Sequence, residues 1–263
     1  MVFSLSIRRR RLAAAIHPRP RSPCGLQKDA DLTDLLFPAP ALQTLPVHGR
    51  AGAYPVNRIF CVGRNYAEHA REMGAEVDRE APFYFTKSPA SLIPSGSALP
   101  YPPGTSDLHH EVELVVALGA PAFRADAGTA ERAVFGYACG LDMTRRDLQA
   151  AAKDKRRPWD TGKDFEGSAV IAPLTPASDF AVADQPIRLR VNGQLRQDGR
   201  LSELVFGVPE LIAHLSTLYH LGPGDLIMTG TPAGVGPVVA GDRIEGEIGG
   251  LAPVHLMTIG PTA

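Results

Sequence analysis

The chain has 263 residues and a mass of 28.0 kDa, which suits one large domain with an appendage or two small domains sharing a core. Its 27 Lys and Arg against 28 Asp and Glu leave a formal net charge of −1, so no overall positive field exists to attract nucleic acid. No apolar run approaches the roughly 18 residues of a membrane-spanning helix, and the 26 Gly and 24 Pro favour a β-rich enzyme with many turns.

The first 28 residues differ from the rest of the chain, because they carry seven Lys or Arg and no acidic residue. Such a start is found in organellar transit peptides and, with paired arginines, in export signals. We favour instead a disordered tail or a misplaced start codon. Residues 1–54 are therefore expected to be an N-terminal extension and lead-in, of which residues 1–30 are dispensable. Three widely spaced cysteines rule out a disulfide framework and favour the cytoplasm, with organellar targeting as the minor alternative.

Residues 58–62 (RIFCV) predict a short buried strand, and a helix is expected to begin soon after it. Asn65 and Glu68 have the spacing of a capping box, with Asn in place of Ser or Thr. His69 and Glu72 then fall at i and i+3, on one face of that helix. A carboxylate held against one imidazole nitrogen can make the other a base near pH 7. By spacing alone, a solvated helix face is the commoner interpretation.

An apolar-rich run at residues 109–118 (HHEVELVVAL) predicts a strand on which Glu111 and Glu113 share one face. Two like charges in an apolar neighbourhood repel each other, and a divalent cation would remove that repulsion. A third carboxylate, Asp142, ends another short apolar stretch. Three carboxylates and water would suit Mg2+, Mn2+ or Ca2+, since oxygen-only ligands favour hard ions over zinc. An exposed charged face is an equally good interpretation of the E-x-E pattern alone.

Two more helices are expected further along the chain. Thr144 and Asp147 form a second capping pattern, for a helix that runs through Gln149 toward Lys153. Apolar residues repeat at helical spacing over residues 208–219, and Gly222 stands where a C-cap would. The apolar stripe at residues 208–219 indicates a helix face that packs on the core and not a cofactor site.

Two loops carry polar groups that could meet an anionic ligand. Lys163 lies in the Gly-bearing loop 159–165 (WDTGKDF), and residues 225–238 (DLIMTGTPAGVGPV) run from a strand into a loop of small residues. In that second loop, Gly230 and Thr231 could bring a backbone N–H and a hydroxyl close to a carboxylate or phosphate. The glycines match neither nucleotide-binding pattern, and no G-x-S-x-G elbow of a serine hydrolase is present.

Four motifs, taken in order, resemble the fumarylacetoacetate hydrolase family: GRNYAEHAREM at 63–73, DLHHEVEL at 107–114, GLDMTRRDLQ at 140–149 and GDLIMTGTPAGVG at 224–236. The resemblance covers about residues 55–256 and implies a catalytic domain at residues 55–258. It implies an α+β, β-rich fold, the family's mixed β-sandwich roll with peripheral helices, in a homodimer. Residues 101–119 and 142–165 look closest to the short fumarylpyruvate hydrolases of gentisate breakdown and to their acylpyruvase relatives.

The resemblance also implies a role for each motif residue. One departure follows Lys163, where the family usually shows a small residue and then Phe-Asp, but this chain has Asp164, Phe165 and Glu166. The implied set is Glu111, Glu113 and Asp142 as ligands of Mg2+ or Mn2+, with Ca2+ as an alternative; His69, Glu72 and Lys163 as catalytic residues; and Arg64, Arg146, Gln149, Gly230 and Thr231 as substrate-binding residues.

The implied reaction is metal-dependent hydrolysis of a carbon–carbon bond in a 2,4-dioxo acid, first of all fumarylpyruvate to fumarate and pyruvate. The expected partner is that small molecule, with no nucleic acid and no membrane. One of Arg64, Arg71, Arg145 and Arg156 is expected to hold the distal carboxylate, so that fumarylpyruvate outranks acetylpyruvate. The same site could serve an oxaloacetate decarboxylase or tautomerase, or a general acylpyruvase. A non-catalytic metal-binding protein of the same fold is disfavoured, because all ligands and the His–Glu pair are present.

Overall fold

The computed structural model describes residues 35–74 and 79–261. Backbone contacts divide the chain into two compact units, Met1–Ala41 and Leu42–Ala263, and every helix and strand named below lies in the second. The expected dispensable segment, residues 1–30, lies outside the described residues. In the described parts of the chain, no helix has both the length and the apolar character that crossing a bilayer requires.

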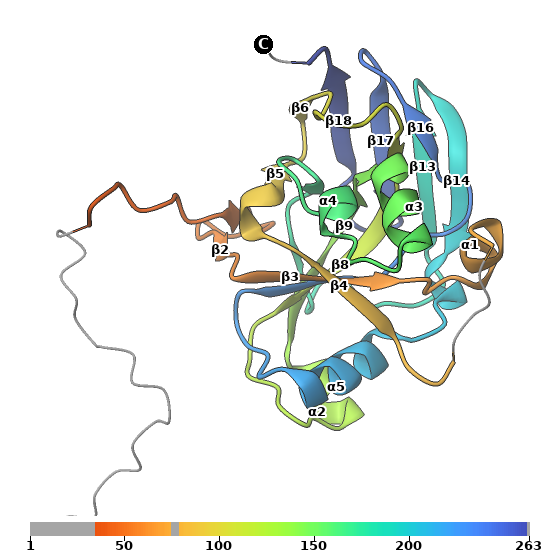
Figure 1. Cartoon of the computed structure of the whole chain (residues 1–263). Coiled ribbons are helices and arrows are strands. Elements are labelled where there is room, and N and C mark those ends of the chain that lie inside the picture. Colours follow the sequence, from red (N-terminus) through yellow and green to blue (C-terminus); the bar gives the residue numbers. More distant parts are fainter. Residues whose placement is uncertain (1–34, 75–78, 262–263) are drawn as a thin grey trace, which may run out of the picture. The chain divides into compact units, whose positions relative to one another are not determined.

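A curled mixed sheet forms the centre of the second unit (Figure 1). Within the described residues it has eight strands in the order β4-β3-β15-β8-β9-β11-β5, with β12 beside β9. The pairs β15–β3 and β11–β5 are parallel, and the other pairs are antiparallel. Its strands are β3 (Arg58–Gly63), β4 (Phe83–Lys87), β5 (Leu92–Pro94), β8 (Val112–Leu118), β9 (Val134–Asp142), β11 (Ala169–Ile171), β12 (Thr175–Pro176) and β15 (Asp225–Met228).

The central strand β8 is buried along its whole length. Val112 and Leu114 pack into one hydrophobic cluster, whereas Val115 and Ala117 on the opposite face pack into another. A strand covered on both faces appears in sequence as a continuous apolar run, which is the pattern of residues 112–118. Because side chains alternate along a strand, Glu113 lies on the Val115 face, in the interior of the protein.

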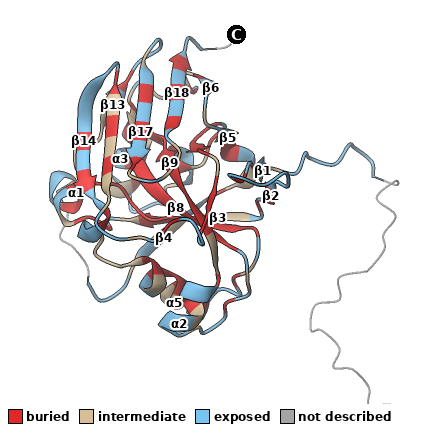
Figure 2. Ribbon diagram, turned by 180° about the vertical axis from the view of Figure 1, so that it is seen from behind, coloured by how far each residue is buried: buried red, intermediate tan, exposed pale blue. Residues whose placement is uncertain are grey.

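A second sheet packs on the first, in the order β14-β13-β17-β18-β6, with β13, β17 and β18 in contact with β8 or β9. Figure 2 shows buried residues alternating with exposed ones along β17 and β18, and with partly buried ones along β13, as expected for strands with one face on the core. The predicted fold class, a β-rich α+β roll, is confirmed. The strands are β6 (Ser97–Pro100), β13 (Pro186–Val191), β14 (Gln194–Arg200), β17 (Arg243–Ile248) and β18 (Val254–Ile259).

Two smaller sheets and several short helices complete the described part of the chain. The strand pair β1–β2 and the sheet β10-β7-β16 lie outside the two main sheets, and α2 packs against α5 at the periphery (Figure 1). The strands are β1 (Thr44–Leu45), β2 (Tyr54–Pro55), β7 (Leu108–His110), β10 (Thr144–Arg145) and β16 (Gly236–Val238). The helices are α1 (Ala67–Glu72), α2 (Ala127–Arg132), α3 (Arg146–Asp154), α4 (Asp160–Lys163) and α5 (Val208–Leu218), with 3-10 turns at Pro89–Ser91 and Leu201–Glu203.

The helix α5 ends earlier than its sequence suggests, and the prediction of Gly222 as its C-cap was wrong. The C-cap residue is Tyr219, which is extended (φ −137°, ψ 147°). The Tyr219 ring lies with its centroid 5.0 Å from that of Phe60 on β3. We attribute the early end to this aromatic contact, which a local capping rule does not include.

An ion pair at the start of β15 is expected to stabilise the fold. Asp225 is fully buried and accepts from Arg58 through two contacts of 2.8 Å and 2.5 Å. Replacing Arg58 by methionine would leave that carboxylate buried without its cation, so we expect a loss of about 2–3 kcal/mol, or roughly 5–10 °C in Tm. The matched control is Arg188→Met, because Arg188 pairs with the exposed Asp198 at 2.8 Å and should contribute less than about 1 kcal/mol. Equal, small shifts in the two melting curves would contradict the expectation.

Candidate active site and metal centre

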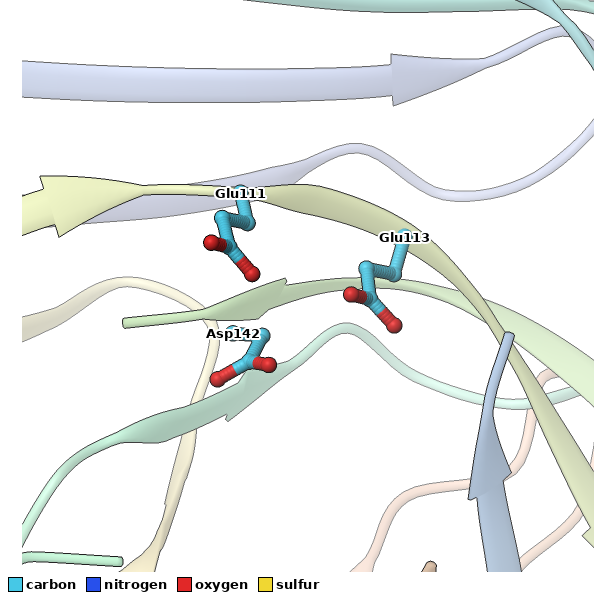
Figure 3. Close-up of side chains that lie close together, drawn as sticks. All are labelled: Glu111, Glu113 and Asp142. Carbon is cyan, nitrogen blue, oxygen red and sulfur yellow. The ribbon is translucent and has the colours of Figure 1, made fainter. Parts of the chain in front are cut away.

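The three acids expected as metal ligands, here called the triad, lie together in the interior (Figure 3). Glu113 is on β8, Asp142 is the last residue of the neighbouring strand β9, and Glu111 directly precedes β8. The backbone N–H of Asp142 donates to the carbonyl of Glu111 over 2.9 Å, which brings their side chains to the same end of the strand pair. The three residues are 4%, 2% and 0% exposed, and one oxygen of each lies within 4.8 Å of the others.

The predicted single strand over residues 109–118 is wrong at Glu111. The chain forms β7 up to His110 and β8 from Val112, and these strands belong to different sheets. The side chain of Gln197 makes the connection between them, because its oxygen accepts from Val112 N over 3.0 Å and lies 3.2 Å from His110 Nδ1. Glu111 therefore lies at a corner between two sheets, and its carboxylate still lies close to those of Glu113 and Asp142.

Lys163 and Arg146 neutralise one side of the triad. The Lys163 ammonium donates to Glu111 Oε2 over 2.6 Å, to Asp142 Oδ2 over 2.7 Å and to Thr144 Oγ1 over 2.7 Å. Arg146 Nη2 donates to Glu111 Oε1 over 2.5 Å. Burial by itself would lower the pKa of Lys163, but Asp142 and Glu111 outweigh it and raise that pKa. Lys163 is thus a buried cation, carried by the short helix α4 and not by the loop that the sequence suggested.

Lys87 is a second buried ammonium at the triad, and no pattern in the sequence indicates it. Its Nζ lies 2.9 Å from Asp142 Oδ1 and donates to the main-chain oxygens of Met143 and Lys163. Asp142 Oδ1 nevertheless accepts no hydrogen bond of good geometry. In sequence, Lys87 looks like the ordinary charged end of the strand FYFTK, since its partners lie far along the chain.

The donor set of the triad fits one hard divalent cation. Glu113 accepts from Gly230 N over 2.8 Å, and burial, Asp142 and Glu111 together raise the pKa of Glu113 well above its ordinary value. Hard divalent ions take carboxylate oxygens at about 2.0–2.6 Å, so oxygens around one ion lie at most ~5 Å apart. The triad oxygens, within 4.8 Å of one another, meet that limit. An all-carboxylate set favours Mg2+ or Mn2+ over softer ions.

His69 and Glu72 form a hydrogen-bonded pair on α1, with His69 Nδ1 3.2 Å from Glu72 Oε2. The Glu72 carboxylate also accepts from Gly234 N, at 3.2 Å to each oxygen, which fixes its position. Burial, the largest influence, lowers the pKa of His69 below 6.5, whereas Glu111 and Glu72 oppose that change. The imidazole is therefore neutral at pH 7, and an Nδ1–H that donates to Glu72 leaves Nε2 free to accept a proton.

The expected capping box at the start of α1 is absent. The N-cap is Tyr66, and no side chain caps it. Asn65 instead donates to the carbonyls of Thr229 and Phe206 over 2.8 Å and 3.1 Å, and it accepts from Phe206 N over 2.8 Å. These contacts satisfy all the polar groups of a side chain that is 1% exposed. Asn65 thus holds the start of α1, and with it the His69–Glu72 pair, against the loop that follows β15.

The second expected cap, at α3, was also wrong, although the predicted helix through Gln149 and Lys153 is present. Its N-cap is Arg145, without a side-chain cap hydrogen bond. Thr144 Oγ1 is taken by Lys163, and Asp147 accepts from Thr105 Oγ1 over 2.6 Å. Both residues therefore connect α3 to neighbouring segments.

A small recess of about 30 Å³ lies beside the triad. His69 and Lys163 both line it, so the candidate base and the candidate substrate-binding ammonium face the same space. The full lining is Gly63, Arg64, His69, Met73, Phe85, Glu111, Arg146, Gln149, Lys153, Trp159 and Lys163. Five of these residues were not predicted as site residues: Gly63 and Met73, at the two ends of the motif 63–73, and Phe85, Lys153 and Trp159, which lie between motifs.

Two residues expected to bind substrate lie outside that lining. The backbone N–H of Gly230 is taken by Glu113, and Thr231 Oγ1 accepts from Gln197 Nε2 over 2.7 Å. In the structure Gly230 thus supports Glu113 of the triad, and Thr231 contacts Gln197 on β14. Among the four arginines proposed for a distal carboxylate, Arg64 is the one in the described lining.

A curled β-rich roll with a buried carboxylate triad and a His–Glu pair defines an enzyme of the fumarylacetoacetate hydrolase family. The family description "Fumarylacetoacetate (FAA) hydrolase C-terminal" matches residues 58–257, so the chain belongs to that family. It is 53% identical over 191 residues to a fumarylpyruvate hydrolase from a Ralstonia species, covering 72% of this chain and 99% of that one. It is 42% identical over 194 residues to the mitochondrial oxaloacetate tautomerase FAHD1 of Homo sapiens, covering 73% and 87%.

A solved structure extends the similarity to three dimensions. The fumarylpyruvate hydrolase of Pseudomonas aeruginosa, crystallised in complex with Mn2+ and pyruvate, superposes with a TM-score of 0.83 at 44% sequence identity. The match covers 86% of this chain and 100% of that chain.

Proposed function

We propose that this enzyme hydrolyses a carbon–carbon bond in a 2,4-dioxo acid, and that its substrate is fumarylpyruvate, cleaved to fumarate and pyruvate. The proposal depends mainly on one observation: His69 and Lys163 line one recess together with Glu111, through which that recess adjoins the triad. The identity with the Ralstonia enzyme supports the choice of substrate. A cytoplasmic location, a homodimer and a place in aromatic breakdown stay predictions.

Glu111, Glu113 and Asp142 would hold a Mg2+ or Mn2+ ion. The ion would supply Lewis acidity to the 2-oxo acid end of the substrate. Arg146 and Gln149, joined by a hydrogen bond of 2.8 Å, would orient that end from α3. Positioned in this way, the carbonyl next to the fumaryl group becomes the electrophile.

His69 would act as the general base. Its Nε2 takes a proton from water, and the hydroxide oxygen adds to the carbonyl carbon next to the fumaryl group. Glu72, held by Gly234, stabilises the imidazolium that forms. Collapse of the tetrahedral adduct breaks the bond to the methylene carbon and leaves a new carboxylic acid group on fumarate, which then releases its proton to solvent.

The electron pair of the broken bond passes to the pyruvate fragment as an enolate. Lys163 is a buried ammonium on the recess lining and would stabilise the enolate oxygen. The proton taken by His69 can then return to the methylene carbon, which gives pyruvate and restores the neutral imidazole. The atoms balance with one water consumed.

A second candidate is tautomerisation of oxaloacetate, favoured by the identity with enzymes of that name. The two reactions share enolate stabilisation and differ in whether water attacks a carbonyl carbon. Purified protein with Mg2+ or Mn2+ should be tested side by side on fumarylpyruvate, acetylpyruvate and oxaloacetate. The proposal expects the highest kcat/KM for fumarylpyruvate with equimolar fumarate and pyruvate; oxaloacetate tautomerisation without dioxo acid cleavage would replace it.

A further inference from the structure

Two cations at the recess form no ion pair with any acid in the described parts of the chain. Arg64 and Lys153 both line it, and no described ion pair or hydrogen bond joins either of them to a carboxylate. The other two cations of the lining, Arg146 and Lys163, are both paired with Glu111. The recess therefore has a neutralised inner part, at the triad, and an unpaired positive part.

The helix α3 sets the order of these groups. Arg146, Gln149 and Lys153 stand at i, i+3 and i+7 and so share one face of the helix. At about 1.5 Å rise per residue, the backbone of Lys153 lies roughly 10 Å along the axis from that of Arg146. Arg146 contacts Glu111 of the triad, so Lys153 is the residue of this helix face farthest along the axis from the triad contact.

The surroundings of Lys153 suit an anion. The side chain is half-buried, and its Nζ lies 5.0 Å from the centroid of the ring of Trp159, the residue before α4. Burial, and then the charges of Arg146 and Arg64, lower the pKa of Lys153 to about 8. A carboxylate placed beside Lys153 and Arg64 would relieve both the desolvation and the repulsion between like charges.

Arg64 has an unusual backbone conformation, with φ 60° in the left-handed region. That region costs an ordinary L-residue about 1–2 kcal/mol, whereas glycine adopts it freely. The residue is exposed and follows Gly63 at the end of β3, so its own packing does not explain the conformation. Strain of this kind is often retained where a side chain must be aimed at a ligand.

We propose that Lys153 and Arg64 together hold the distal carboxylate of a dicarboxylic acylpyruvate and so select it over a monocarboxylic one. This inference rests on the proposed function. The other three arginines considered above have different surroundings: Arg71 pairs with the exposed Glu68 at 2.5 Å, Arg145 lies over the Phe165 ring, and Arg156 is outside the recess lining.

The test compares kcat/KM for fumarylpyruvate and acetylpyruvate in the metal-loaded enzyme. Lys153→Met should lower the fumarylpyruvate value roughly 10- to 100-fold, as for the loss of a charge-assisted hydrogen bond, and leave acetylpyruvate within about 3-fold. Lys153→Arg should restore most of the preference. Lys155→Met, an exposed lysine at the end of the same helix, is the matched control and should change neither value.

Arg64→Gly provides a second variant whose folding is not at risk, because glycine relieves the positive φ. It should lower the preference for fumarylpyruvate without lowering Tm. Equal losses on both substrates, or no loss, in both variants would overturn the clamp. If the wild type cleaves neither acid, the proposed function fails, and the clamp is then tested separately by calorimetric titration with fumarate. An unchanged fumarate affinity in Lys153→Met rejects the clamp. A loss of affinity of about 10-fold or more supports it.

Discussion

Replacing His69 by alanine should slow carbon–carbon cleavage roughly 100- to 10,000-fold, the usual effect of removing a positioned general base. Metal affinity should stay nearly unchanged, because His69 belongs to α1 and contacts Glu72, whereas the triad belongs to β8, β9 and the residue before β8. The measurement is kcat on fumarylpyruvate, with metal content determined on the same preparation.

Glu72→Gln should be milder than the loss of the imidazole. Its amide can still orient His69 and accept from Gly234, but it cannot stabilise the imidazolium. Because burial lowers the pKa of His69, the neutral base should persist below pH 6.5, so the acid limb of kcat/KM should lie below that pH in the wild type.

A His69→Ala protein that holds its metal and works within a few-fold of the wild type would exclude the proposed base.

Replacing Glu113 by glutamine should abolish tight metal binding and slow turnover at least ~100-fold, since Lewis-acid stabilisation is worth several kcal/mol. The substitution keeps the shape of the side chain and lets it accept from Gly230. It also removes an acid whose ionisation burial, Asp142 and Glu111 oppose. The metal-free variant should therefore melt at or above the temperature of the metal-free wild type, because the ionised Glu113 carboxylate is disfavoured in the folded protein.

The readout is thermal unfolding with and without MnCl2, beside activity. Ligand binding raises Tm only when the folded protein holds the ion, so the wild type should shift upward and Glu113→Gln should not. Glu247→Gln, an exposed acid on β17, is the matched control and should shift like the wild type. An equal Mn2+-dependent shift in Glu113→Gln would remove this carboxylate from the ligand set.

Local sequence patterns predicted much of the fold and the inner site. The strand at residues 58–62, the alternation around Glu113 and the strand that ends at Asp142 all follow from short-range periodicity, and the structure contains them. The spacing of His69 and Glu72 likewise placed their side chains in contact. The predictions that failed concern side chains whose partners lie far away in sequence.

Both capping predictions failed for the same physical reason. Asn65 and Thr144 have side chains that can cap a helix, but in the folded chain they meet Thr229 and Lys163, which are 164 and 19 positions away. A buried amide or hydroxyl takes whichever arrangement satisfies its polar atoms best, and here tertiary partners do so. Lys87 and Gln197 were missed likewise, since their partners Asp142 and Thr231 are far from them in sequence and only the folded chain brings them together.

In the proposed mechanism, water activated by His69 attacks the carbonyl next to the fumaryl group at a metal-loaded triad. Single-turnover cleavage of fumarylpyruvate in 18O-water, followed by mass spectrometry of the products, shows whether the oxygen comes from water. The mechanism predicts one 18O atom in the newly formed carboxylate of fumarate, formed only when Mg2+ or Mn2+ is present. Fumarate without the label, or the same labelled product at the same rate in protein freed of metal, would contradict it.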